Sequence, residues 1–227
     1  MAIGTCTFGA LGWHGAAVLF AFFIPAVALS HLGRARKRAL LDVGKLGPRD
    51  GAQVLANGGV AAVCALLAVV HAVPFAAAFA GALAAAAADT WGTEIGTLVL
   101  SRPRSLLTLR PIETGLSGGV TCLGTLAECA GAAVVAAVAS LAGIAAFVPV
   151  AAGGLAGALA DSILGASIQE LRHCATCAKV CETDPHACGA ATQRIRGAHA
   201  IGNDTVNALS TLVGGAVAAT LAMIPSR

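Results

Sequence analysis

The chain has few charged residues, and this shortage is its first informative feature. Asp, Glu, Lys and Arg make up 11% of its 227 residues, whereas a soluble domain carries about 25%. The composition therefore excludes an ordinary soluble domain, and the 57% of hydrophobic residues indicates an integral membrane protein. Tyrosine is absent, and Ala and Gly dominate. Helices built from such small residues can pack closely, backbone against backbone.

Several other signals are missing. The first segment, MAIGTCTFGALGWHGAAVLFAFFIPAVAL, has no basic start and no clear cleavage site, which favours a retained helix over a signal peptide. The glycines at 118–119 are not followed by Gly-Lys-Ser/Thr, so this stretch is not a Walker loop. The net charge of +3 does not indicate nucleic-acid binding, because the charges are confined to the loops.

Six hydrophobic segments predict an all-α fold, a polytopic transmembrane helical bundle that forms a single domain over residues 1–227. Each span needs about 20 apolar residues. The predicted spans are 11–32, 52–72, 75–100, 119–146, 148–170 and 200–223.

The basic residues predict the orientation. Of the 14 Lys and Arg residues, all but Arg227 lie in the polar stretches 33–51, 101–118 and 171–199, which share one face if there are six spans. By the positive-inside rule that face is cytoplasmic and both termini are outside. Polar residues at membrane depth cluster near the same face, which predicts a cytoplasmic polar vestibule rimmed by Lys and Arg.

Acidic residues within the predicted spans are the strongest functional signal. A carboxylate in hydrocarbon costs about 2.5–3.5 kcal/mol on insertion scales, and it usually faces a bundle interior or a wet cavity. The predicted catalytic and Mg²⁺-binding carboxylates are Asp89, Glu94, Asp161 and Asp204. Mg²⁺ takes one or two carboxylates, keeps some water and binds substrate phosphates. The alternative is that neighbouring side chains satisfy these carboxylates.

Asp89 and Glu94 are five residues apart in AADTWGTEIG, whereas neighbours on one helix face are three or four apart. They could share a site if the helix breaks, as Gly92 and Gly96 permit, or if both flank a cleft.

The segment GALADSILGASIQ carries a small or polar residue at every fourth position, which makes one stripe on a helix. Its members are Gly157, Asp161, Gly165 and Gln169. The glycines either pack against another helix or let a ligand approach closely.

Further polar residues near the same face are predicted to bind the phosphate groups of a substrate or nucleotide. Gly118 and Gly119 precede the fourth span, where free backbone N–H groups and the helix dipole favour anions. The full set is Asn57, Arg102, Arg104, Ser117, Gly118, Gly119, Thr121, Asn203 and Asn207. The alternatives are a helix N-cap for Asn203 or Asp204, the positive-inside signal for the arginines and a flexible loop entry for the glycines.

The cytoplasmic loop 171–199 contains the Cys-rich stretch RHCATCAKVCETDPHACG. A CxxC pair followed by HxC within 15 residues has the spacing of a small structural zinc site. The candidate ligands are Cys174, Cys177, His186 and Cys188. A cytoplasmic location argues against disulfides. The alternative is a reduced Cys-rich loop without metal.

Seven motifs follow one another in a recognisable order: QVLANGG, AADTWGTEIG, SRPR, SGGVTCLGT, ADSILGASIQ, CATCAKVCET and NDTVN. In this combination the chain resembles an integral-membrane family long catalogued without a function, whose plant members act as phytyl-phosphate kinases in tocopherol synthesis. The resemblance covers about residues 34 to 215. By similarity, the matching positions are Asp89, Glu94, Arg102, Arg104, Gly118, Gly119, Asp161, Asn203, Asp204 and Asn207.

The resemblance implies a Mg²⁺-dependent membrane prenyl-phosphate kinase. Such an enzyme would transfer a phosphoryl group from CTP or ATP to an isoprenyl monophosphate, such as phytyl, geranylgeranyl or farnesyl phosphate. The alternatives are a CTP-dependent lipid-phosphate cytidylyltransferase, an ion or metal transporter that uses the intramembrane carboxylates, and a scaffold whose Cys-rich loop senses metal or redox state. The sequence leaves the donor nucleotide, the prenyl length and the oligomeric state open.

Overall fold

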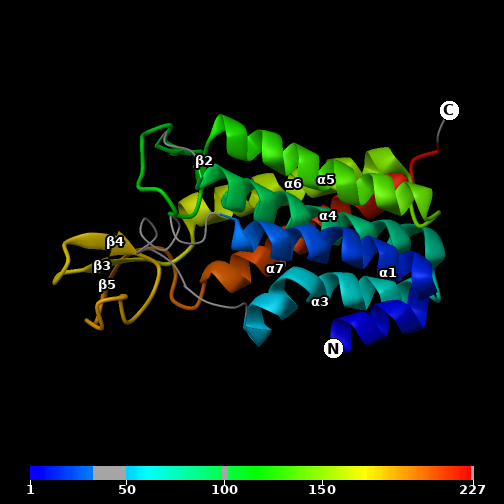
Figure 1. The fold of residues 1–227 in the computed structure, drawn as a ribbon, viewed down its shortest axis with the longest axis horizontal. Helices are drawn as coiled ribbons and strands as arrows, with labels where there is room; N and C mark the ends of the chain where they lie inside the picture. The colour runs from blue at the N-terminus through cyan, green and yellow to red at the C-terminus, as the bar shows by residue number, and fades with distance from the viewer. Residues whose placement is uncertain (33–49, 99–101, 226–227) are drawn as a thin grey trace.

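The computed structural model describes residues 1–32, 50–98 and 102–225. Within these residues, six helices are long and apolar enough to cross a membrane. They are α1 (Ala2–His31), α3 (Gly51–Ala68), α4 (Ala72–Gly96), α5 (Cys122–Leu141), α6 (Phe147–Ser167) and α7 (Asn203–Ala222). The predicted all-α transmembrane bundle is therefore confirmed (Figure 1).

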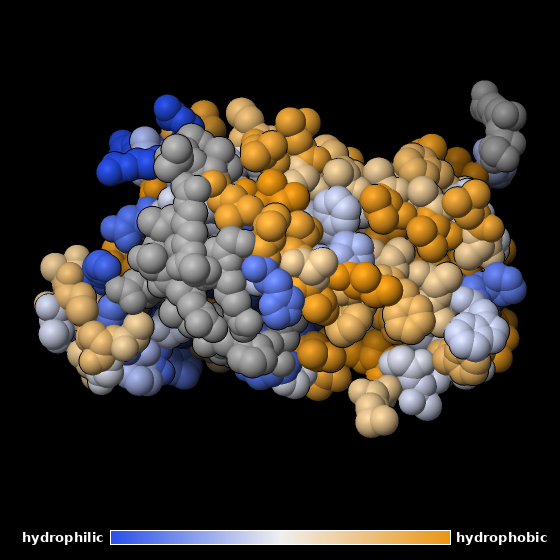
Figure 2. Space-filling model, viewed as in Figure 1, coloured by the Kyte–Doolittle hydropathy of each residue, from blue (hydrophilic) through white to orange (hydrophobic). Residues whose placement is uncertain are grey.

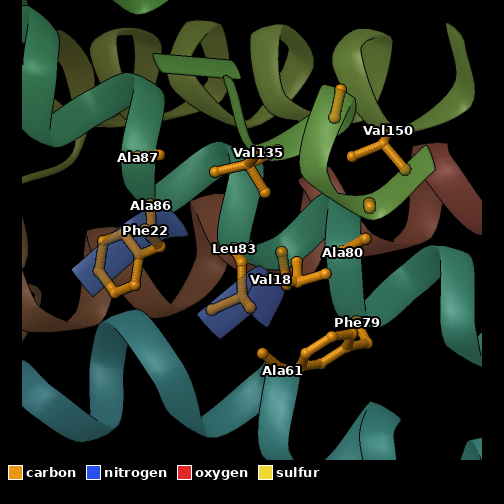
Figure 3. Close-up of a cluster of buried hydrophobic side chains, with 14 of the residues drawn as sticks. Val18, Phe22, Ala61, Phe79, Ala80, Leu83, Ala86, Ala87, Val135 and Val150 are labelled. Carbon is orange, nitrogen blue, oxygen red and sulfur yellow. The ribbon is translucent and has the colours of Figure 1, made fainter. Parts of the chain in front are cut away.

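Helix α4 lies at the centre and packs against each of the other five spanning helices. Every residue from 76 to 88 of this helix is buried, and most of them are alanines. A helix that is apolar on all sides is expected to be buried, and alanines let its neighbours come close. In Figure 3, Phe79 and Leu83 of α4 lie among side chains of the neighbouring helices, including Val18 of α1 and Val135 of α5.

Close contact between α4, α6 and α7 requires glycine at several positions. A Cβ on Gly153 would lie 2.5 Å from the carbonyl oxygen of Gly214, and a Cβ on Gly81 would lie 2.7 Å from the same oxygen. A Cβ on Gly157 would lie 2.3 Å from the Cβ of Ala85. Gly157 therefore serves helix packing, which was one of the two interpretations of its stripe.

Helix α1 changes direction at Gly12, where the backbone has φ 58° and ψ −147°. Ile3, before this break, packs against the middle of α3, since a Cβ on Gly58 would lie 2.8 Å from the Ile3 Cδ1 atom. The part of α1 after the break corresponds to the predicted span 11–32. The predicted span began at residue 11 and left out the short helical segment before the break.

Helix α5 is shorter than its predicted span, 119–146. Thr121 caps its N-terminus, because the Thr121 Oγ1 atom accepts a hydrogen bond from the backbone N–H of Gly124. At the other end, Gly143 has φ 68°, and the N–H of Ile144 donates back to the carbonyl oxygen of Ala139. A glycine with positive φ just after the last turn commonly ends a helix.

Two small antiparallel sheets lie together at one end of the bundle (Figure 1). Strand β1 (Arg104–Ser105) pairs with β2 (Gly119–Val120). Strands β3 (Leu171–Cys174), β4 (Lys179–Cys181) and β5 (Gln193–Arg196) form the second sheet, in the order β4-β3-β5. The sequence analysis treated both stretches as loops without strands.

Residues 102–118 and 171–199, from two of the predicted polar stretches, share this strand-bearing end, as six spans require, and α7 runs from it to the opposite end (Figure 1). The six basic residues of the predicted stretch 33–51 lie outside the described residues. On the face shown in Figure 2, hydrophobic residues cover most of the helical part, and hydrophilic residues gather at the strand-bearing end.

Candidate functional site

Three spanning helices carry a carboxylate at about the same depth from the strand-bearing end. Asp89 lies seven residues before the end of α4, and Asp161 lies six residues before the end of α6. Glu128 lies six residues after the start of α5. Because an α-helix rises about 1.5 Å per residue, each of these carboxylates lies roughly 10 Å inside its helix.

These three carboxylates lie close enough to interact across the helices. The charges of Asp89, Glu128 and Glu182 act on the carboxylate of Asp161, and the charge of Asp89 also acts on Glu128. Ser210 of α7 lies beside Asp161, and its hydroxyl donates to the carbonyl oxygen of Asn207 at 3.0 Å. Together with Asp89 and Glu128, Asp161 forms what we name the carboxylate group.

The carboxylate group contains a buried carboxylate oxygen that has no hydrogen-bond partner among the described residues. Asp161 is 9% exposed, and its Oδ2 atom is buried without a hydrogen-bond partner among the described residues. Acidic side chains close together repel one another when ionised, and a cation or a bound proton removes that repulsion. Carboxylate oxygens are also the ligands that Mg²⁺ prefers in proteins.

Glu128 was not among the predicted site residues. It fills the space that Gly92 leaves open on α4, since a Cβ on Gly92 would lie 2.6 Å from the Glu128 Cγ atom and 2.8 Å from its Oε1 atom. The available signal in the sequence was its place as an acidic residue within the predicted span 119–146.

No helix break turns Glu94 and Asp89 to the same side, because α4 is continuous to Gly96. Residues five apart on a continuous helix are turned roughly 140° from each other. Gly92 and Gly96 instead let α5 approach, since a Cβ on Gly96 would lie 3.4 Å from the Cα of Gly124. Glu94 is half-buried on another side of α4.

At the start of α7, Gly202 occupies the N-cap position. Asn203 and Asp204 therefore lie in the first turn and do not cap the helix. Asn203 is exposed, and Asp204 is half-buried. Asn207 is buried and lies one turn before Ser210, the neighbour of Asp161 on α7.

Ser117 in the loop before α5 binds a carboxylate of the protein itself. Its backbone N–H donates to Glu182 Oε1 at 2.7 Å, and its hydroxyl donates to Glu182 Oε2 at 2.9 Å. Gln169, which follows α6, donates from Nε2 to Glu182 Oε2 at 2.9 Å and to Ser117 Oγ at 2.8 Å. The sequence analysis missed Glu182, because local spacing says nothing about a partner 65 residues away.

Gly118 and Gly119 lie in a turn and in β2, before the start of α5 at Cys122. Gly118 has φ 78° and packs directly on α6, where an added Cβ would lie 2.5 Å from the backbone nitrogen of Ala166. On the opposite side of this contact, a Cβ on Gly165 would lie 2.9 Å from the Gly118 nitrogen. Both glycines, 118 and 165, are therefore required by the close approach of two segments of this chain.

The remaining predicted phosphate-binding residues each contact their own segment or solvent. Asn57 donates from Nδ2 to the carbonyl oxygen of Gln53 at 3.0 Å. Arg104 donates from Nη1 to the carbonyl oxygen of Leu109 at 2.9 Å, and Arg102 is exposed. Thr121 is the N-cap of α5.

The segment between β3 and β5 brings the four predicted zinc ligands together. We name Cys174, Cys177, His186 and Cys188 the Cys/His cluster; their ligand atoms all lie within 4.8 Å of one another. The sulfurs of Cys174 and Cys188 are 3.7 Å apart, and His186 Nδ1 is 3.2 Å from the sulfur of Cys188. Tetrahedral Zn²⁺ with Zn–S bonds of about 2.3 Å sets two sulfurs roughly 3.8 Å apart. Among the described residues, the Cys/His cluster is a group of side chains whose ligand atoms lie close enough together to hold one metal ion.

Hydrogen bonds within the Cys/His cluster shift the pKa values of two of its thiols in opposite directions. The hydrogen bond with His186 lowers the pKa of Cys188 to about 6. Hydrogen bonds with Cys188 and Cys174 raise the pKa of Cys177 to about 11. The hydrogen bond from His186 thus favours the thiolate of Cys188, and the thiolate is the form of cysteine that binds metals.

A second network, centred on Arg172 of β3, holds the same segment. Arg172 donates from Nε to Thr192 Oγ1 at 2.6 Å and from Nη2 to Asp184 Oδ2 at 2.8 Å, and it forms an ion pair with Glu170. Asp184 also accepts hydrogen bonds from the backbone N–H and the hydroxyl of Thr192, both at 3.0 Å. The bonds from Thr192 and the charge of Arg172 lower the pKa of Asp184.

Together these features define a class: a helical integral membrane protein with acidic side chains near one end of its bundle and the Cys/His cluster of candidate metal ligands at that same end. The model of the family described as "Integral membrane protein DUF92" matches residues 1–215, and the chain belongs to this family. The integral membrane location predicted from the sequence is thereby confirmed.

Relatives of the chain occur in plants, archaea and cyanobacteria. Protein PGR of Arabidopsis thaliana is 31% identical over 234 residues, which cover 89% of this chain and 79% of that protein. An uncharacterized membrane protein of Methanocaldococcus jannaschii is 32% identical over 66% of this chain and 63% of its own length. An uncharacterized membrane protein of Synechocystis is 27% identical over 74% of this chain and 68% of its own length. No solved structure matches the chain.

Proposed function

We propose that this protein is a membrane prenyl-phosphate kinase, which transfers a phosphoryl group from CTP or ATP to an isoprenyl monophosphate. The observation that carries this proposal is the carboxylate group, which lies roughly 10 Å inside one end of the bundle. One of its oxygens, Asp161 Oδ2, is buried and has no hydrogen-bond partner among the described residues. An isoprenyl phosphate keeps its tail in lipid and its head near the membrane surface. The depth of the carboxylate group suits such a head.

Mg²⁺ is the cofactor that we propose for this site, held by Asp89, Glu128 and Asp161. When bound, it would supply positive charge that neutralises the phosphates and the charge that develops during transfer. Glu94 and Asp204, which the sequence also predicts as Mg²⁺ ligands, stay predictions. A Zn²⁺ ion in the Cys/His cluster would be structural and would take no part in the transfer.

The transfer itself needs positioning more than acid–base chemistry. An oxygen of the isoprenyl monophosphate attacks the γ-phosphorus of the nucleotide, the bond to the β–γ bridging oxygen breaks, and the nucleoside diphosphate leaves. Because the attacking phosphate is already an anion, no strong general base is required. The exposed Arg102 and Arg104 would attract the anionic nucleotide to the strand-bearing end, which we place in the cytoplasm.

An ion or metal transporter is the alternative from another class. Transporter sites typically lie near the bilayer midplane and use interrupted helices. The middle of α4 is a run of buried alanines, and the carboxylate of this helix, Asp89, lies toward one end. This placement favours an enzyme with its substrates at one membrane surface.

The test uses the purified full-length protein in detergent or nanodiscs. It is incubated with phytyl, geranylgeranyl or farnesyl monophosphate, Mg²⁺ and each nucleoside triphosphate, and the products are identified by mass. We expect a prenyl diphosphate and a nucleoside diphosphate. Asp89→Asn and Asp161→Asn should each abolish the reaction while the protein stays in the membrane. The exposed Glu113 provides the matched control, and Glu113→Gln should keep wild-type activity.

Other products would identify a different activity. Pyrophosphate together with a cytidylylated lipid would identify a cytidylyltransferase at the same site. Full kinase activity in Asp161→Asn, or no product with any combination of substrates, would overturn the proposal.

A further inference from the structure

We propose that one Zn²⁺ ion in the Cys/His cluster acts as a clasp. The ion fixes the segment that carries Glu182, and Glu182 in turn holds the Ser117–Gly119 loop against α6. This inference does not depend on the proposed kinase activity, because it concerns metal binding and loop motion alone.

The first step concerns the position of Glu182 between the candidate ligands. Cys177 lies five residues before Glu182, and His186 lies four residues after it. A metal bound at both positions closes a ring over residues 177–186. Closing so short a ring removes most of the conformational freedom of its members, including Glu182. The free energy of metal binding therefore also orders this segment.

The second step concerns what Glu182 binds. Its carboxylate accepts three hydrogen bonds, two from Ser117 and one from Gln169. Gln169 is 1% exposed and lies just after α6. A carboxylate so placed loses hydration, so its bonds to Ser117 and Gln169 are needed to offset that cost. The contact joins the loop before α5, which carries Ser117, to Gln169 after α6 and to Glu182 after β4.

The third step connects this contact with the intramembrane site. Next to Ser117, Gly118 packs on the backbone of α6 at Ala166, only a few residues from Asp161. The charge of Glu182 also acts on Asp161. Loss of the metal would increase the motion of Glu182, loosen the Ser117–Gly119 loop and change the charge environment of Asp161.

The segment also has an anchor that does not involve the metal. Arg172 binds Asp184 and Thr192, which keeps residues 183–192 attached to β3. Because β4 also pairs with β3 at Cys181, removal of the metal is expected to weaken the contact between Glu182 and Ser117 without unfolding the segment or the bundle.

The first measurement is the metal content of the purified full-length protein. We expect one Zn²⁺ per chain, and Co²⁺ substitution should give the absorption of cobalt–thiolate bonds. Cys177→Ser and Cys188→Ser should each lower the retained zinc at least about tenfold. Cys129, exposed on α5, provides the matched control, and Cys129→Ser should keep the full zinc content. A wild-type protein that holds no zinc in micromolar Zn²⁺ would overturn the proposal.

The second measurement is hydrogen–deuterium exchange of residues 103–121 in the full-length protein. Chelation of zinc should speed exchange in this segment about tenfold, because its hydrogen bonds to the Glu182 carboxylate become weaker. Zinc-loaded Glu182→Gln should show the same increase, whereas zinc-loaded Glu113→Gln should match wild type. If Glu182→Gln does not fold, the comparison of wild type with and without zinc decides alone. Unchanged exchange on zinc removal, or in folded Glu182→Gln, contradicts the clasp.

Discussion

Gly92 of α4 faces Glu128 of α5 so closely that a Cβ on Gly92 would lie 2.6 Å from the Glu128 Cγ atom. The glycine thereby leaves room for an acidic side chain beside Asp89, whose charge acts on Glu128. One missing Cβ on α4 therefore helps to set the geometry of the carboxylate group.

We expect Gly92→Ala to displace Glu128. Because the Glu128 side chain can turn aside, the change should disturb the site more than the stability of the bundle. Prenyl-phosphate kinase activity should fall at least about tenfold, a loss of roughly 1.4 kcal/mol of transition-state stabilisation. The control is Gly59→Ala on α3, where an added Cβ meets nothing within 4 Å. Equal activity in the two variants would contradict this role of Gly92.

Gly153→Ala should destabilise the bundle itself. The added Cβ would lie 2.5 Å from the backbone oxygen of Gly214 and 2.9 Å from the Cβ of Ala218, so α6 and α7 must separate. Overpacking of this kind costs about 1–3 kcal/mol. Thermal unfolding of the detergent-solubilised protein measures the loss, with Gly59→Ala again as the control. Unchanged thermal stability would show that α6 and α7 can separate at little cost.

Arg172→Ala should loosen residues 183–192. The substitution leaves Asp184 without its charged partner and Thr192 without two hydrogen bonds, from Nε at 2.6 Å and from Nη2 at 2.9 Å. Hydrogen exchange in this segment should become at least about tenfold faster, since charged hydrogen bonds contribute about 1.5–3 kcal/mol each. Arg194→Ala, at an exposed position of the neighbouring strand β5, should leave exchange unchanged. Similar effects of both changes would indicate a general charge effect.

The orientation in the membrane can be tested with reporter fusions. We expect green fluorescent protein fused after Gly202, at the strand-bearing end, to fluoresce in the cytoplasm. Alkaline phosphatase fused after Arg227 should be active outside, because α7 crosses from one end of the bundle to the other (Figure 1). The reverse pattern would place the basic residues outside and contradict the positive-inside rule for this protein.

The sequence predicted the helices because each spanning segment is marked by its own hydrophobic residues. It also predicted the members of the Cys/His cluster, because Cys174, Cys177, His186 and Cys188 lie within 15 residues, and short spacing restricts where their side chains can go. The depth of Asp89 and Asp161 follows from counting residues along a helix of known rise. All of these are local properties of the chain.

The tertiary structure alone decided which side chains meet between segments. Hydrophobicity places a helix in the membrane but leaves its rotation about its own axis open, and packing through Gly92, Gly153 and Gly157 sets that rotation. The same holds for Ser117 and Glu182, whose two hydrogen bonds join positions 65 residues apart. Contacts of this kind arise from the close packing of whole elements, which no local pattern in the sequence records.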